Sequence, residues 1–68
     1  MIEIHLDQYL KKRQMTLTQL SEAVDITIAN LSILKSGKAK AIRFSTLEKI
    51  CEVLEYQPGD LISYVPED

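Results

Sequence analysis

The 68 residues carry 8 basic and 10 acidic side chains, so the formal net charge of −2 gives no sign of a nucleic-acid binder. With 46 % hydrophobic residues, 2 glycines and 2 prolines, the composition excludes a disordered tail. A single cysteine and a single histidine exclude an internal disulfide and a structural zinc site, and no apolar run long enough for a signal peptide or a membrane span is present. We therefore expect one small cytoplasmic domain, spanning residues 1–68, without metal or cofactor.

The charges are distributed unevenly along the chain. Residues 1–25 sum to −1, residues 26–47 contain four basic and no acidic side chains, and residues 48–68 sum to −5. The net charge of the whole chain therefore hides a cationic middle third.

The N-terminal half predicts a strand and two helices. Residues 2–6 alternate between apolar and polar, the period of a half-buried strand. Asp7 is expected to cap a first helix that ends near residue 14. Thr16 is expected to cap a second helix, whose apolar stripe is Leu17, Leu20 and Val24. Asp25 then ends that helix, because aspartate tolerates the left-handed conformation of a sharp turn.

The C-terminal half predicts two further helices, a short helical turn and a strand. Thr27 is expected to cap a helix over residues 28–36, which ends at Ser36-Gly37 and precedes a basic loop. The sequence Ser45-Thr46-Leu47-Glu48 has the form of a capping box, followed by an apolar stripe through residue 54. Pro58 suits the first position of one more turn. Residues 61–65 are β-prone, so the two terminal segments are expected to pair, within one chain or across a dimer.

The helix predicted over residues 28–36 presents chemically distinct faces. At 100° per residue, Leu31 and Leu34 lie on one side and the opposite side is free to project outward. Asn30, on a flank, can make a bidentate contact with adenine, and apolar side chains can contact thymine methyl groups. The outward and flanking residues are Ile28, Ala29, Asn30, Ser32, Ile33 and Ser36. Since this face lacks arginine, we expect an A·T preference or modest specificity.

Two short helices joined by a three-residue turn form one unit over residues 16–36. A basic loop follows this unit. Ser21 is small enough to line the helix crossing, and Ile26 can fill the space between the helices. This run, and its continuation to the end of the chain, resembles the helix-turn-helix of small phage-repressor/Cro-like (Xre-like) bacterial regulators, in a compact single-domain subgroup. Leu17 stands where the wider family usually has Gln, and Ile28 where it commonly has a polar residue.

The resemblance implies an all-α, four- to five-helix, lambda-repressor-like DNA-binding domain and a role in transcriptional control, with double-stranded DNA as partner. The terminal segments would add a short two-stranded sheet. The resemblance and the outward-face geometry together give the expected DNA-binding residues, with Lys35 and the basic loop meeting phosphates: Thr16, Thr18, Thr27, Ile28, Ala29, Asn30, Ser32, Ile33, Lys35, Lys38, Lys40 and Arg43.

Two function classes fit this sequence, and a third does not. The first is a DNA-binding repressor that acts as a homodimer, because one copy offers only about three or four phosphate contacts. The second is an antitoxin-like or anti-repressor-like module that binds a protein through Ile28, Ala29 and Ile33, since exposed apolar side chains on one helix mark interaction sites. An enzyme is not expected, because the chain shows no nucleophile–base pair, phosphate loop or metal cluster.

Overall fold

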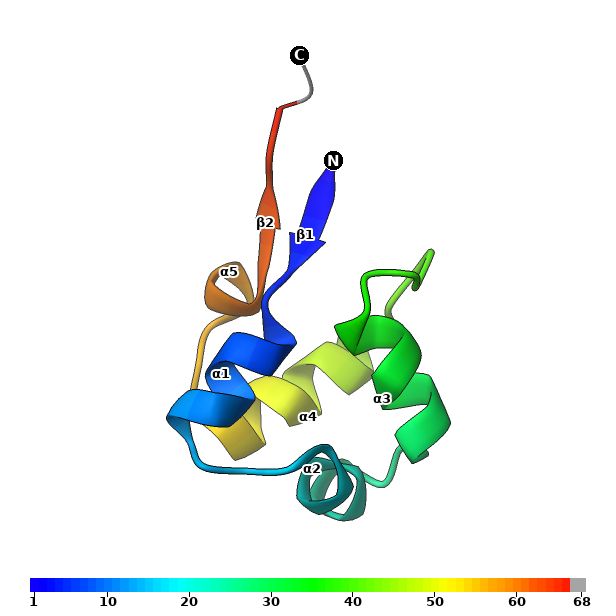
Figure 1. Ribbon diagram of the computed structural model, residues 1–68, viewed down its shortest axis with the longest axis vertical. Coiled ribbons are helices and arrows are strands. Elements are labelled where there is room, and N and C mark those ends of the chain that lie inside the picture. Colours follow the sequence, from blue (N-terminus) through cyan, green and yellow to red (C-terminus); the bar gives the residue numbers. More distant parts are fainter. Residues whose placement is uncertain (67–68) are drawn as a thin grey trace.

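The computed structural model describes residues 1–66 and shows five helices beside a two-stranded antiparallel sheet (Figure 1). The acidic residues Glu67 and Asp68, counted above in the C-terminal charge, lie outside the described residues. The elements in chain order are β1 (Ile2–Ile4), α1 (Leu6–Lys12), α2 (Leu17–Val24), α3 (Ile28–Lys35), α4 (Phe44–Leu54), α5 (Pro58–Leu61) and β2 (Ile62–Tyr64). The predicted fold class is confirmed.

Local capping defines the unit formed by α2, the turn and α3. The Thr16 hydroxyl accepts from the Gln19 backbone N–H at 3.1 Å, and the Gln19 side chain accepts from the Thr16 N–H at 2.9 Å. Asp25 adopts the left-handed conformation, with φ 57°. Thr27 caps α3 by accepting from the Asn30 N–H at 3.2 Å. These side chains satisfy backbone donors that a helix start leaves unpaired, so the predicted helix boundaries here are confirmed.

The turn itself is tied to α2 by a small polar side chain. The Ser21 hydroxyl donates to the Ile26 carbonyl, and the Ile26 N–H donates to the Ser21 carbonyl at 3.3 Å. Ile26 is half-buried and packs against the core, as its predicted filling role requires. Ser21 therefore does more than leave room at the crossing, because it also bonds to the turn.

Two predicted caps are wrong. Helix α1 begins at Leu6 with His5 in the capping position, so Asp7 lies inside the first turn instead of before it. Helix α4 begins at Phe44, one residue before the predicted capping box, and Arg43 precedes it without a side-chain cap. Packing decides both boundaries, because Leu6 and Ile50 are buried and fix which face of each helix meets the core.

The second capping box of the fold lies at α5. The Gln57 N–H donates to the Asp60 carboxylate at 3.0 Å, and Pro58 occupies the first turn, as predicted. His5 is half-buried, and its Nε2 lies 2.6 Å from the Ser63 hydroxyl.

Nine apolar side chains from all five helices form one buried core. Each fully buried aliphatic side chain contributes about 1.5–3 kcal/mol of transfer free energy. Cys51 lies at the edge of this core, half-buried, and burial raises the pKa of its thiol. The buried residues are Leu6, Leu10, Leu20, Val24, Leu31, Leu34, Ile50, Leu54 and Leu61.

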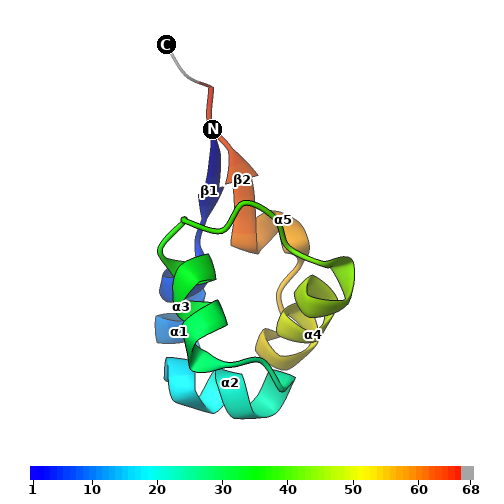
Figure 2. The same ribbon diagram turned by 90° about the vertical axis from the view of Figure 1, so that its right-hand side faces the viewer.

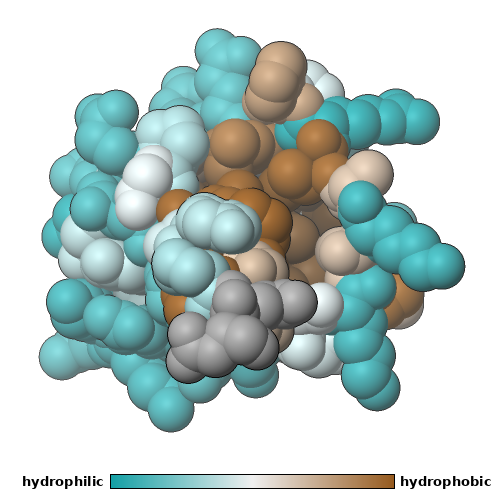
Figure 3. All heavy atoms as spheres, turned by 90° about the horizontal axis from the view of Figure 1, so that it is seen from above, coloured by the Kyte–Doolittle hydropathy of each residue, from teal (hydrophilic) through white to brown (hydrophobic). Residues whose placement is uncertain are grey.

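The terminal strands pair within one chain and form a ribbon, defined here as β1 with β2. The register joins Ile2 to Tyr64, Glu3 to Ser63 and Ile4 to Ile62. Figures 1 and 2 show the ribbon at one end of the long axis and α2 at the other. Seen from above the ribbon, apolar residues gather around a hollow (Figure 3).

Two tyrosines that lie far apart in the sequence meet beside α1. The ring centroids of Tyr9 and Tyr56 are 4.3 Å apart, and both rings pack at the edge of the core. The Arg13 guanidinium lies 4.6 Å from the Tyr56 ring centre, and its Nε donates to the Leu54 carbonyl at 2.7 Å. Arg13 thereby satisfies a carbonyl that the end of α4 leaves unpaired.

Candidate nucleic-acid interface

The outward face of α3 is exposed as the helical geometry predicts. Leu31 and Leu34 are buried in the core, while the exposed fractions of Ile28 and Ile33 are 46 % and 48 %. Ala29, Asn30 and Ser32 are exposed between and beside them. The Asn30 side-chain amide has no hydrogen-bond partner among residues 1–66, because the Thr27 hydroxyl receives only its backbone N–H. This helix therefore offers a free amide and two apolar side chains to an outside partner.

A groove of about 630 Å³ lies between α3 and the loop that leads to α4. Figure 2 looks onto this face, with α3 and the start of α4 on either side and the loop above. The groove brings together five of the predicted DNA-binding residues, which are Thr27, Asn30, Ile33, Lys40 and Arg43. Residues of α3 and of the loop therefore share one concave surface.

The loop supplies exposed positive charge. Lys38, Lys40 and Arg43 are exposed, and within the described part of the chain none of them forms an ion pair. Arg43 directly precedes α4, whose first turn contains no acidic residue. The partial positive charge of that helix start adds to the field of the three cations. This surface is therefore suited to anionic groups such as phosphates.

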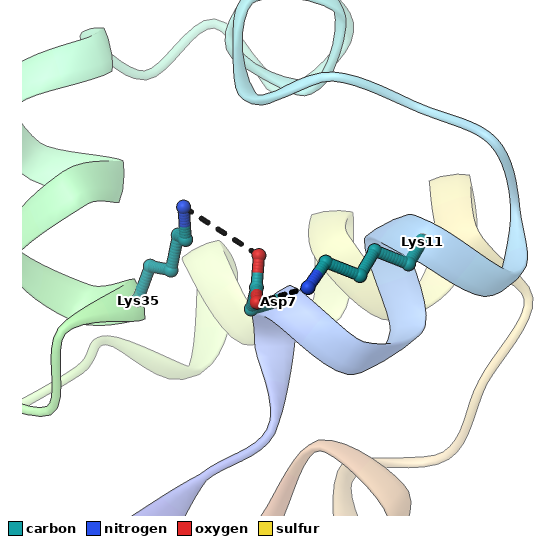
Figure 4. A network of polar contacts seen from close by, with 3 residues as sticks. All are labelled: Asp7, Lys11 and Lys35. Carbon is teal, nitrogen blue, oxygen red and sulfur yellow. Dashed lines mark ion pairs between the residues drawn. The ribbon is translucent and has the colours of Figure 1, made fainter.

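Lys35 differs from the loop cations because it already has a partner. Its ammonium nitrogen lies 3.5 Å from one Asp7 oxygen, while Lys11 lies 3.2 Å from the other (Figure 4). The hydrogen bond from Lys11, together with the charge of both lysines, holds the pKa of Asp7 below its usual value. Lys35 does not line the groove, so the structure separates it from Lys40 and Arg43.

The two threonines predicted on α2 have different environments. The Thr16 hydroxyl is occupied by its capping bond to Gln19, and Thr18 is exposed. Neither lines the groove. Ser32, Ala29 and Ile28 also lie outside it, on the outer side of α3.

Three residues near this surface were missed by the sequence reading. Thr46 lines the groove, although the sequence pattern assigned it to a capping box. Asp25 also lines the groove and places one carboxylate beside the cations. Asp7 reaches Lys35 from another helix, and no local pattern marks that contact. The prediction that Asp25 ends α2 was a signal of its position, because a turn residue two positions before Thr27, the cap of α3, must lie close to the start of α3.

The described residues meet neither of two further criteria, one for a metal site and one for a membrane-spanning helix. Among residues 1–66, no three His, Cys, Asp or Glu side chains gather in a way that could hold a metal ion. The helices in the same part of the chain are too short or too polar to cross a membrane.

Residues 5–67 match the family described as the Cro/C1-type HTH DNA-binding domain. The chain belongs to this family. A relative in Bacillus subtilis (strain 168), named as the uncharacterized HTH-type transcriptional regulator YozG, is 65 % identical over 63 residues, which are 93 % of this chain and 75 % of that protein. The resemblance of the helix-turn-helix unit to Xre-like and Cro-like regulators is confirmed. Membership in this family supports DNA as a partner of the chain.

Proposed function

We propose that this chain is a sequence-specific transcriptional repressor that inserts α3 into the major groove of DNA. The observation that carries the proposal is that the exposed face of α3 and two cations of the loop, Lys40 and Arg43, line one groove, with the exposed Lys38 on the same loop. An α-helix with its side chains is about 10–12 Å across, which suits the width of the major groove. Asn30 would read adenine, and Ile28 and Ile33 would contact thymine methyl groups.

In this proposal the loop grips phosphates and two copies of the domain bind a two-fold site. Lys38, Lys40 and Arg43 supply about three phosphate contacts, which correspond to a salt slope near −3 per copy at roughly −0.9 per contact. Two copies double that slope, with half-sites about 34 Å apart. The membership in a DNA-binding family and the similarity to a named transcriptional regulator support this reading.

Charge reversal tests the phosphate contacts. We expect Lys38→Glu, Lys40→Glu and Arg43→Glu each to weaken duplex binding, and the triple variant to abolish it, with the thermal midpoint nearly unchanged. Arg43→Glu is informative because an acidic residue at the start of a helix is favourable, so lost binding would not reflect unfolding. Lys12→Glu, on α1, is the control with the same charge change. Normal duplex binding by the triple variant would contradict the proposal.

Selection of bound duplexes from a random pool, at two salt concentrations, tests base reading. We expect an A·T-leaning, palindromic consensus for the wild type. Asn30→Ala should relax the selection at one position in each half-site, at a cost of about 1–3 kcal/mol in discrimination. A pool that remains random for the wild type would show that α3 does not read sequence.

The exposed pair Ile28 and Ile33 favours a second candidate function, which is docking of α3 on a protein. The two candidates differ in salt dependence. A protein complex that is insensitive to salt, lost in Ile28→Asp and Ile33→Asp, and accompanied by no duplex binding would favour the second.

A further inference from the structure

The ribbon has one open edge. In an antiparallel pair, alternate residues direct their backbone N–H and C=O groups toward and away from the partner strand. The Val65 N–H donates to the Met1 carbonyl at 2.8 Å and the His5 N–H donates to the Leu61 carbonyl at 2.7 Å. Met1, Glu3 and His5 therefore face β2, and the backbone groups of Ile2 and Ile4 point outward from β1.

The opposite edge of the ribbon offers fewer free backbone N–H groups. The outward positions of β2 are Ile62 and Tyr64, followed by Pro66. The Ile62 N–H already donates to the Pro58 carbonyl, and Pro66 has no N–H to donate. Proline and short strands are ordinary protections of a sheet edge, and β1 has no proline. The edge available for pairing is therefore that of β1.

The apolar side of the ribbon is also incompletely covered. Ile4 and Ile62 are half-buried against the core, whereas the exposed fractions of Ile2 and Tyr64 are 59 % and 69 %. Beside them lies the hollow of Figure 3, of about 300 Å³, lined by Ile4, Ile42 and the two alanines of the loop among others. Two isolated strands are marginal in water unless further strands or helices cover their apolar side.

We propose that β1 pairs antiparallel with β1 of a second copy of this chain, so that the two ribbons form one four-stranded sheet. In the register that pairs Ile2 with Ile4 of the partner subunit, the outward groups of both residues meet and can form four hydrogen bonds. The exposed Ile2 then lies next to the partner's Ile4, at the edge of the partner's hollow. This arrangement pairs the outward backbone groups of β1 and also covers the exposed side chain of Ile2.

The symmetry of this pairing favours a second copy over an unrelated strand. Antiparallel pairing of two identical edges places a two-fold axis perpendicular to the sheet. The ribbon face that carries Ile2 and Ile4 shares its hollow with Leu34 of α3 and with the loop after α3, so the axis leaves the ribbon on the side where that loop lies. Both copies then present α3 on the same side. This inference rests on the proposed function, which calls for two copies on a two-fold site.

The position of Glu3 gives a way to test this register. Glu3 is the only charged side chain of β1 and β2, and it lies on the face opposite Ile2 and Ile4. Two Glu3 side chains meet directly across the axis, where like charges destabilise pairing. The loop cations lie on the other face of the sheet, beside the hollow, and leave the axis free of further charge. We therefore expect Glu3→Gln to strengthen the dimer.

Sedimentation equilibrium without DNA tests the pairing. Wild type should dimerise in a concentration-dependent way, Glu3→Gln should lower the dimer dissociation constant about two- to threefold, and Ile2→Pro should raise it about tenfold or more. Ile2→Pro removes an outward N–H and leaves the internal ladder intact, while Ile2→Val retains the N–H and is the control. Equal dissociation constants for Ile2→Pro and wild type, or a monomeric wild type, would overturn the proposal.

Cross-linking tests the register. In a Cys51→Ala background, Glu3→Cys should form an inter-chain disulfide quickly, because directly opposed residues of a non-hydrogen-bonded pair lie about 4.5 Å apart. Tyr64→Cys, which is also exposed but lies on the edge formed by β2, is the control. Faster cross-linking at position 64 would overturn the pairing. Both tests omit DNA, so a dimer that binds no duplex would refute only the proposed function, and a DNA-binding monomer only this inference.

Discussion

Asp7 of α1 reaches across to Lys35, the last residue of α3, with 3.5 Å between the carboxylate oxygen and the ammonium nitrogen. Lys35 is the one basic residue of α3, and this contact neutralises it beside the face proposed to meet DNA. In the proposed complex with DNA, Asp7 would therefore compete with phosphates for Lys35.

Replacing Asp7 with asparagine should release Lys35 for DNA. We expect Asp7→Asn to raise non-specific duplex affinity and to steepen the salt slope by about 0.9 per copy, the value of one additional phosphate contact. The measurement is the duplex dissociation constant across a range of salt concentrations. In a Lys35→Gln background the same change should have little effect. An equal gain in both backgrounds would mean that Asp7 repels DNA directly.

The ionisation of Asp7 should depend more on Lys11 than on Lys35, because the hydrogen bond from Lys11 is the main cause of its lowered pKa. A carbon NMR titration of the Asp7 carboxyl should show the pKa rising toward its usual value in Lys11→Gln, and rising less in Lys35→Gln. Since folding lowers this pKa, the associated stability is complete above the unfolded-state pKa and is lost as the pH falls through the folded-state pKa. An Asp7 pKa unchanged by Lys11→Gln would contradict this assignment.

Arg13 should matter more for stability than its neighbour Lys12. Arg13→Ala removes the bond to the Leu54 carbonyl and the contact with Tyr56, and we expect a loss of about 1–2 kcal/mol in the free energy of unfolding. Lys12 lies 4.8 Å from the Tyr9 ring centre, and Lys12→Ala should cost less than about 1 kcal/mol. Urea unfolding measures both. Similar losses would show that the carbonyl bond contributes little.

Replacing Glu55 with glycine should stabilise the fold. It ends α4 in the left-handed conformation, with φ 60°, where a Cβ atom crowds the backbone. We expect Glu55→Gly to raise the free energy of unfolding by about 0.5–1 kcal/mol, because its backbone carbonyl remains available to Arg13. Asp25→Gly should bring a smaller gain, since aspartate tolerates this conformation better. A lower thermal midpoint in Glu55→Gly would contradict this explanation.

Much of the helix-turn-helix could be predicted from the sequence because its signals are local. Thr16 and Thr27 each bond to a backbone N–H three residues later, and Asp25 forms the turn between them. The same reasoning was wrong at Asp7 and at Ser45. Both residue types can cap a helix, but neither residue occupies a capping position here. Propensity names candidate caps, and the burial of Leu6 and Ile50 selects the helix starts.

The sequence by itself determined the order of the helices, the outward face of α3 and the cationic middle third, because periodicity and charge are properties of neighbouring residues. Only the tertiary structure decided that Lys35 would meet Asp7, that Arg13 would bond to the end of α4, and that β1 would keep an open edge. Each of these depends on residues 28 or more positions apart, brought together by burial of a shared core. No local pattern records that packing.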